Sequence, residues 1–177
     1  MYASFTSGTY HFLEQLTKKY LHKHDFYFMK SARSTIVYYE HKRKKSIFVS
    51  GKTFSILKSY ETIQPKGFVT MEHIPVSSDS ADAFEARAKK LFLDLTERRG
   101  VVAMRLLRQL KKDEFVILTQ WKSERDEEFW RTSPTYEYQN VRDFARMSAY
   151  FAERPFVNSF YMIEEDDDVE EVEEEED

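Results

Sequence analysis

The order of expected strands and helices in residues 66–163 restricts the fold more than any other feature of the sequence. Helix starts are expected at the capping residues Ser77 to Asp79, at Ser123, and at Ser133 with Pro134. Runs rich in β-branched and aromatic residues predict strands over residues 68–76, 101–110, 114–121 and 156–163. The order strand, helix, strand, strand, helix, helix, strand predicts a ferredoxin-like α+β unit.

Residues 1–65 are interpreted as a degenerate copy of the same unit. After an extended start at residues 2–5, a helix capped by Thr9 is expected to end near Leu21. Strands are predicted over residues 26–29, 35–40 and 47–49, with a basic hairpin tip at 41–45 and a short helix at 51–60. Two such units, with antiparallel sheets together and helices outside, predict a fold of the dimeric α+β-barrel type. The barrel is expected within one monomer, formed by halves 1–65 and 66–163, with a homodimer as the alternative.

The charge of the chain is divided unevenly. Residues 164–177 hold 12 acidic residues and no basic ones, and they can bury too little to fold, so they are predicted to be a disordered acidic tail. The remaining body has 27 Lys and Arg against 19 Asp and Glu, a net charge of +8 that attracts anions. The basic residues 42–45 lack interleaved aromatic side chains, so no specific nucleic-acid binding is expected. The tail either aids solubility or docks on that basic segment.

Several classes of protein are excluded by what the sequence lacks. Without cysteine there are no disulfides, thiolate metal sites or cysteine nucleophiles. His22 and His24 stand in an expected turn, so no metal site is predicted. No apolar stretch approaches the roughly 18 residues of a membrane span, and the first residues lack the layout of a signal peptide. A cytoplasmic protein is expected, with peripheral membrane association as an alternative.

A family resemblance rests on short segments in a fixed order. They are Phe5–Thr9 with Phe12 and Leu13, Gly67 with Phe68, Met104–Arg108, Phe115–Trp121, and Trp130 with Ser133 and Tyr136. In these segments the chain resembles the antibiotic biosynthesis monooxygenase superfamily over residues 1 to about 163. Its nearest likeness there is to the heme-degrading monooxygenases with an N-terminal extension and to their relative, the signal transduction protein TRAP.

The resemblance implies specific positions for heme. In the heme-degrading members an Asn on the first strand of the second unit, a Trp on the short helix and a His ten residues later serve the heme. Trp130 matches the Trp, whereas Glu72 stands at the Asn position and Asn140 at the His position. If the protein is an enzyme, Glu72, Trp130 and Asn140 are its catalytic positions, with oxygen and an external reductant as co-substrates. Because an amide does not replace imidazole on iron, the resemblance implies heme binding without the family's route to degradation.

Two further residues are expected to bind the cofactor. His73 is the alternative iron ligand, because a shift of one residue would turn it, instead of Glu72, toward the ligand. Arg105 and Arg108 face opposite sides of one strand, and an arginine in the cavity suits a heme propionate. We therefore expect His73, Arg105 and Trp130 around one pocket. A Glu72–Arg105 ion pair and a core role for Trp130 are the alternatives.

Two hypotheses of function follow. The first is a heme-degrading-monooxygenase-like protein that binds heme or another small, flat, hydrophobic anion. The second is a non-catalytic, TRAP-like signal transduction or stress-response regulator that acts through protein or membrane contacts. An open cavity lined by Glu72, His73, Asn140 and Trp130 would favour the first hypothesis, and a filled barrel would favour the second.

Overall fold

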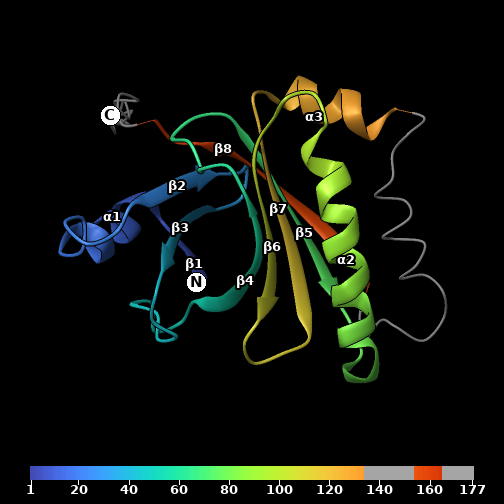
Figure 1. Cartoon of the computed structure of the whole chain (residues 1–177). Coiled ribbons are helices and arrows are strands. Elements are labelled where there is room, and N and C mark those ends of the chain that lie inside the picture. The colour runs from blue at the N-terminus through green and yellow to red at the C-terminus, as the bar shows by residue number, and fades with distance from the viewer. Residues whose placement is uncertain (134–153, 165–177) are drawn as a thin grey trace.

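The computed structural model describes residues 1–133 and 154–164, which form one barrel with helices on its outside (Figure 1). The strands are β1 (Tyr2–Gly8), β2 (Phe26–Lys30), β3 (Thr35–His41), β4 (Lys52–Tyr60), β5 (Phe68–Pro75), β6 (Val101–Gln109), β7 (Glu114–Trp121) and β8 (Phe156–Met162). The helices are α1 (Tyr10–Lys18), the short 3-10 helix Ser78–Ser80, α2 (Ala81–Thr96) and α3 (Glu124–Arg131).

The strands close into a barrel in the order β1-β3-β2-β8-β5-β7-β6-β4. Every pairing is antiparallel. Closure matters because an open sheet would leave a row of unpaired backbone groups at each edge. The predicted α+β class is confirmed, and the barrel is completed within a single chain, as expected from the two halves.

Both halves of the chain use their strands in the same spatial order. The first half runs β4-β1-β3-β2 and the second runs β8-β5-β7-β6, so each has the order fourth, first, third, second. The fourth strand of each half pairs with the second strand of the other, which makes the two seams β4–β6 and β8–β2. We propose on this basis that residues 1–65 and 66–163 are two copies of one unit.

The core is divided into an interior and two outer layers. Apolar side chains such as Tyr38 and Leu107 fill much of the barrel interior. On the outside of the first half, α1 buries Leu13 against β3. On the other side of the molecule, α2 covers the second sheet, where the rings of Phe84 and Phe115 lie 4.8 Å apart between centroids (Figure 1). Alternate residues of each strand therefore face either the interior or a helix layer.

The predicted helix starts at Thr9 and Ser123 are confirmed. The Thr9 hydroxyl accepts a hydrogen bond from the backbone N–H of Phe12, and the Ser123 hydroxyl accepts one from Asp126. These side chains satisfy amide groups that have no partner within the helix. Helix α1 ends at Lys18, three residues before the expected end near Leu21.

Two predictions for the segment before Pro65 are wrong. Residues 47–49 form no strand, and Phe48 is buried in the layer under α1 instead. The expected helix at 51–60 is strand β4, which pairs with β1 and β6. Its register shifts between Ile56 and Lys58, so Leu57 is an extra residue, a β-bulge. The bulge breaks the two-residue alternation and gives the apolar positions a helix-like spacing.

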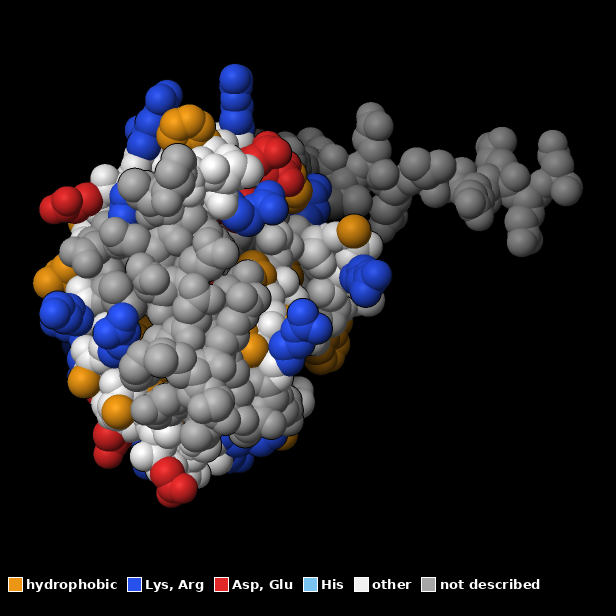
Figure 2. Space-filling model, turned by 90° about the vertical axis from the view of Figure 1, so that its right-hand side faces the viewer, with side chains coloured by type: hydrophobic (Ala, Val, Ile, Leu, Met, Phe, Trp, Pro, Cys, Tyr) orange, Lys and Arg blue, Asp and Glu red, His pale blue; other side chains and the backbone are white. Residues whose placement is uncertain are grey.

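Two predicted elements lie outside the described residues, namely most of the helix expected from Ser133 and the acidic tail from residue 165. Within the described ranges, no helix combines the length and apolarity that a membrane crossing needs. Figure 2 shows one face of the molecule, on which the described Lys and Arg side chains are spread around the margin rather than gathered in one cluster.

Candidate functional site

The first candidate site is a pocket on the outside of the barrel, between β5, β8 and α3. We call it the outer pocket. Its volume is about 470 Å³, and Thr70, Glu72 and Trp130 line it. Trp130 is 7% exposed and packs on Trp121, with 5.2 Å between ring centroids. The indole N–H of Trp121 donates to the Thr70 hydroxyl at 3.1 Å, which fixes the surface under Trp130. The outer pocket therefore offers a rigid aromatic wall beside a buried carboxyl group.

Carboxyl groups dominate the charge of the outer pocket. Glu72, Glu124 and Glu127 line it together with one cation, Arg131. Burial raises the pKa of Glu127, although the charge of Arg131 and its hydrogen bond to Glu127 act in the opposite direction. Tyr161 donates its hydroxyl hydrogen bond to Glu124, and this bond is the main cause of the raised pKa of Tyr161. Among these carboxyl groups, that of Glu127 is thus protonated at a higher pH than a free Glu side chain.

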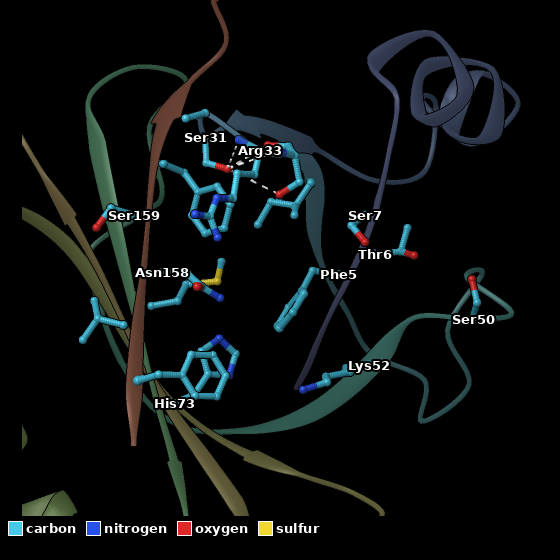
Figure 3. Close-up of a pocket in the computed structure, with 17 residues that line it drawn as sticks. Phe5, Thr6, Ser7, Ser31, Arg33, Ser50, Lys52, His73, Asn158 and Ser159 are labelled. Carbon is cyan, nitrogen blue, oxygen red and sulfur yellow. Dashed lines mark hydrogen bonds between the residues drawn. The ribbon is translucent and has the colours of Figure 1, made fainter. Parts of the chain in front are cut away.

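The second candidate site lies inside the barrel, at the end where the β2–β3 turn faces β8; we call it the barrel cavity. It has a volume of about 660 Å³ and is lined by residues of both halves. Figure 3 shows His73 and Lys52 at one end, Arg33 at the other, and Phe5 and Asn158 between them. Its described lining contains the cationic side chains of Arg33 and Lys52 and, unlike that of the outer pocket, no Asp or Glu.

A chain of hydrogen-bonded polar side chains forms the end of the barrel cavity near His73. His73 donates from Nδ1 to Glu114 Oε1 at 2.7 Å, and Lys52 Nζ donates to both Glu114 carboxylate oxygens at 3.2 Å. Burial alone would raise the pKa of Glu114, but the bonds from His73 and Lys52 outweigh it and hold that pKa below its usual value of 4.5. Glu114 is therefore ionised near neutral pH and fixes the orientation of the His73 ring.

Arg105 points into the barrel, where protein groups engage it. Its Nε donates to Glu40 Oε1 at 2.6 Å, and its Nη1 donates to the backbone oxygens of Tyr60, Glu61 and Met104. Arg108 faces outward, as expected for a residue three positions later. The expected alternative of a Glu72–Arg105 ion pair is wrong, because Glu72 lies on the outer face of the sheet and Arg105 on the inner face.

The expected gathering of His73, Arg105 and Trp130 around one pocket is also wrong. Trp130 lines the outer pocket, His73 lines the barrel cavity, and Arg105 binds Glu40 inside the barrel. Strand alternation is the cause, since neighbouring residues of β5 point to opposite faces. Glu72 and Trp130 do share the outer pocket. Asn140 lies outside the described residues.

Comparison with protein families finds a match within the second half of the chain. Residues 68–138 match the family described as antibiotic biosynthesis monooxygenase. A curated relative, a heme-degrading monooxygenase of Listeria monocytogenes, is 25% identical over 129 residues, which cover 73% of this chain and 76% of the relative. The resemblance expected from the sequence motifs is confirmed.

Solved structures show that the likeness in fold extends over both halves of the chain. A staphylococcal protein described as a major regulator of pathogenesis has a TM-score of 0.81 and 20% identity, covering 93% of this chain and all of its own. A heme-degrading enzyme from Listeria monocytogenes has a TM-score of 0.70 and 20% identity, covering 91% of this chain and 99% of its own. At these identities the likeness concerns the fold alone.

Sequence reasoning missed the charged residues of the barrel cavity. Lys52 was expected on a helix and Glu114 only as the start of a strand, and Arg33 falls between two expected strands with no role assigned to it. Charged residues at inward positions of strands were the available signal, because Glu114 alternates with the buried Val116 and Leu118. Among residues 1–133 and 154–164, no cluster of three or more His, Asp or Glu side chains is placed to hold a metal ion.

Replacing Glu114 with glutamine should lower the free energy of unfolding at pH 7 by about 1–2 kcal/mol, because the ion pair with Lys52 is lost. The folded-state pKa of Glu114 is depressed. Its charge-dependent stability is therefore complete above the unfolded pKa and is lost as the pH falls through the folded value. Urea unfolding at pH 7, 5 and 3 should show the difference between wild type and variant shrinking on acidification.

The control for this pH dependence is Glu128→Gln, because Glu128 is exposed on α3. Its effect on stability should be small at each pH. A Glu114→Gln difference that stays constant from pH 7 to pH 3 would show that the Glu114 charge does not stabilise the fold.

Proposed function

We propose that the protein binds heme, or a flat anionic ligand of similar shape, against Trp130 in the outer pocket, as a relative of heme-degrading monooxygenases. The observation that carries this proposal is that Glu72 and Trp130, which the resemblance aligns with the family's Asn and Trp, line the same pocket. A rigid aromatic wall beside a concave space is what a planar ligand requires. The family match and the curated heme-degrading relative support the choice of ligand.

The groups that line the outer pocket fit a planar ring better than they fit an iron atom. Its described lining contains no His or Met, and its one phenol, Tyr161, is bonded to Glu124 and has a raised pKa, which disfavours the phenolate form. The sequence has no histidine after His73, so residues 74–177 cannot supply imidazole. We therefore infer ligand binding without iron ligation by the protein.

The anionic groups of the ligand can be placed from the charges around the outer pocket. Arg131 is the cation on its described lining, and a ligand carboxylate would bind there in bidentate fashion. Burial raises the pKa of Glu127, which lowers the repulsion that its carboxyl group exerts on such a ligand. The remaining ligand carboxylates would stay in water, away from Glu72 and Glu124.

Hemin titration followed by absorbance tests this proposal. We expect wild type to bind hemin, and we expect Trp130→Phe to bind it about three- to tenfold more weakly, because a smaller ring gives less stacking area. His73→Ala should bind hemin as wild type does, because His73 faces the barrel cavity. Addition of ascorbate should leave the bound hemin intact in all three proteins.

The double variant Glu72→Asn/Asn140→His serves as the comparison, because it restores the residues that the family resemblance places at these two positions. It should change the Soret band relative to wild type. Loss of the hemin spectrum in His73→Ala, or an unchanged affinity in Trp130→Phe, would contradict the outer pocket as the binding site. Breakdown of hemin by wild type under ascorbate would contradict binding without turnover.

A further inference from the structure

The barrel wall is open beside the barrel cavity. Strand β8 pairs with β5 over residues 156–161, but it pairs with β2 only through Met29–Met162 and Lys30–Tyr161. The rest of β8 instead faces the β2–β3 turn, residues 31–34, and both segments line the cavity. This gap is a mouth to a space of about 660 Å³, which is within the range of small-molecule sites, about 300–1,000 Å³.

The charge at this mouth is positive. Arg33 is exposed on the β2–β3 turn, and its side chain reaches toward the β8 side of the cavity (Figure 3). No ion pair of Arg33 occurs among the described side chains. At the far end the charge of Lys52 is offset by Glu114. The Arg33 guanidinium therefore faces the cavity without an ion-pair partner among the described side chains.

Apolar side chains form the middle of the cavity. Phe5, Met71 and Phe160 line it, and the ring of Phe156 stacks on His73 with 4.5 Å between centroids and an interplanar angle of 8°. With Nδ1 of His73 bonded to Glu114, Nε2 is the ring nitrogen left for a ligand. From its opening to its closed end, the cavity is thus lined first by a cation, then by apolar side chains and then by polar groups.

The geometry points to a second binding site, in the barrel cavity, for an amphipathic monocarboxylate. The cavity shares Ser31, Ala32, Val157 and Ser159 with the outer pocket, but Trp130 lines only the outer pocket and Arg33 only the cavity. Its carboxylate is held by Arg33, since a guanidinium matches a carboxylate with two parallel hydrogen bonds. Its apolar body lies along Phe5, Met71 and Phe160 inside the barrel. A neutral ligand of the same shape gains only the apolar contacts, and a fully polar anion gains only the contact with Arg33.

Isothermal titration calorimetry with 4-phenylbutyrate tests the site on the full chain. One molecule should bind per chain, and the neutral 4-phenylbutanamide should bind about tenfold more weakly. Arg33→Gln should weaken the acid about tenfold and leave the amide unchanged. Because Arg33 is exposed on a turn, this variant should fold as wild type does, which its urea unfolding curve verifies.

Two variants separate this site from non-specific attraction and from the outer pocket. Lys44→Gln removes one exposed positive charge away from the cavity and should leave binding of the acid unchanged. Trp130→Phe alters the outer pocket and should also leave it unchanged. The proposal is overturned if the acid does not bind, if acid and amide bind alike, if Arg33→Gln and Lys44→Gln have equal effects, or if Trp130→Phe weakens the acid.

Discussion

Arg105→Met is expected to lower the free energy of unfolding by about 3–5 kcal/mol, because it leaves Glu40 without its cation inside the barrel wall. The guanidinium is 4% exposed and also donates to backbone oxygens that would lose their partner. Tyr38, which is buried and donates to Glu40, cannot neutralise the carboxylate. Urea unfolding at pH 7, followed by tryptophan fluorescence, measures the loss.

Two further variants define what the Arg105 result means. Arg108→Met removes a side chain from the same strand that is 28% exposed and forms ion pairs with Asp82, Glu85 and Asp113, so about 1 kcal/mol should be lost. Glu40→Gln combined with Arg105→Met should recover part of the stability, because no unpaired charge remains. If Arg105→Met costs no more than Arg108→Met, Arg105 is free to serve a ligand, as the sequence had suggested.

The second half of the fold could be predicted because its signals are local. The capping residue Ser123, the acidic first turn of α3 and the continuous apolar, β-branched run of β7 each act within a few positions. Strand β4 could not be predicted in the same way. Its bulge at Leu57 imitates helical spacing, and its strand conformation depends on pairing with β6, about 50 residues away.

The same distinction holds for the candidate sites: local features could be predicted from the sequence, and contacts between the two halves could not. The opposite directions of Glu72 and His73 follow from strand alternation, so their separation into two cavities could be derived from the sequence. The partner of Arg105 could not, because Glu40 stands 65 positions away in the other half of the chain. The Lys52–Glu114 pair spans 62 positions and likewise depends on how the two halves meet. Contacts across the seams of the barrel carry no local signal.

Gly67→Ala should lower the free energy of unfolding by about 3 kcal/mol or more, because the backbone and the available space both exclude a side chain. Gly67 has φ of +112°, and an added Cβ would lie 2.4 Å from the backbone oxygen of Trp121. Neither partner can move freely: β7 and β5 are paired beside this point, and the Gly67 oxygen accepts from Met162 N–H at 3.0 Å. Thermal and urea unfolding at pH 7 measure the effect.

Gly8→Ala is the matched control for this substitution. A Cβ at Gly8 would meet the side chain of Phe12 at 3.0 Å, and Phe12 is 56% exposed and can move aside. The change should therefore be within about 0.5 kcal/mol of neutral, since alanine also restricts the unfolded chain. The contrast would place the rigid junction between the halves at Gly67, where β5 starts between β7 and β8. Equal effects of the two substitutions would mean that the chain relaxes at Gly67, and that β5 is not held there by this close approach.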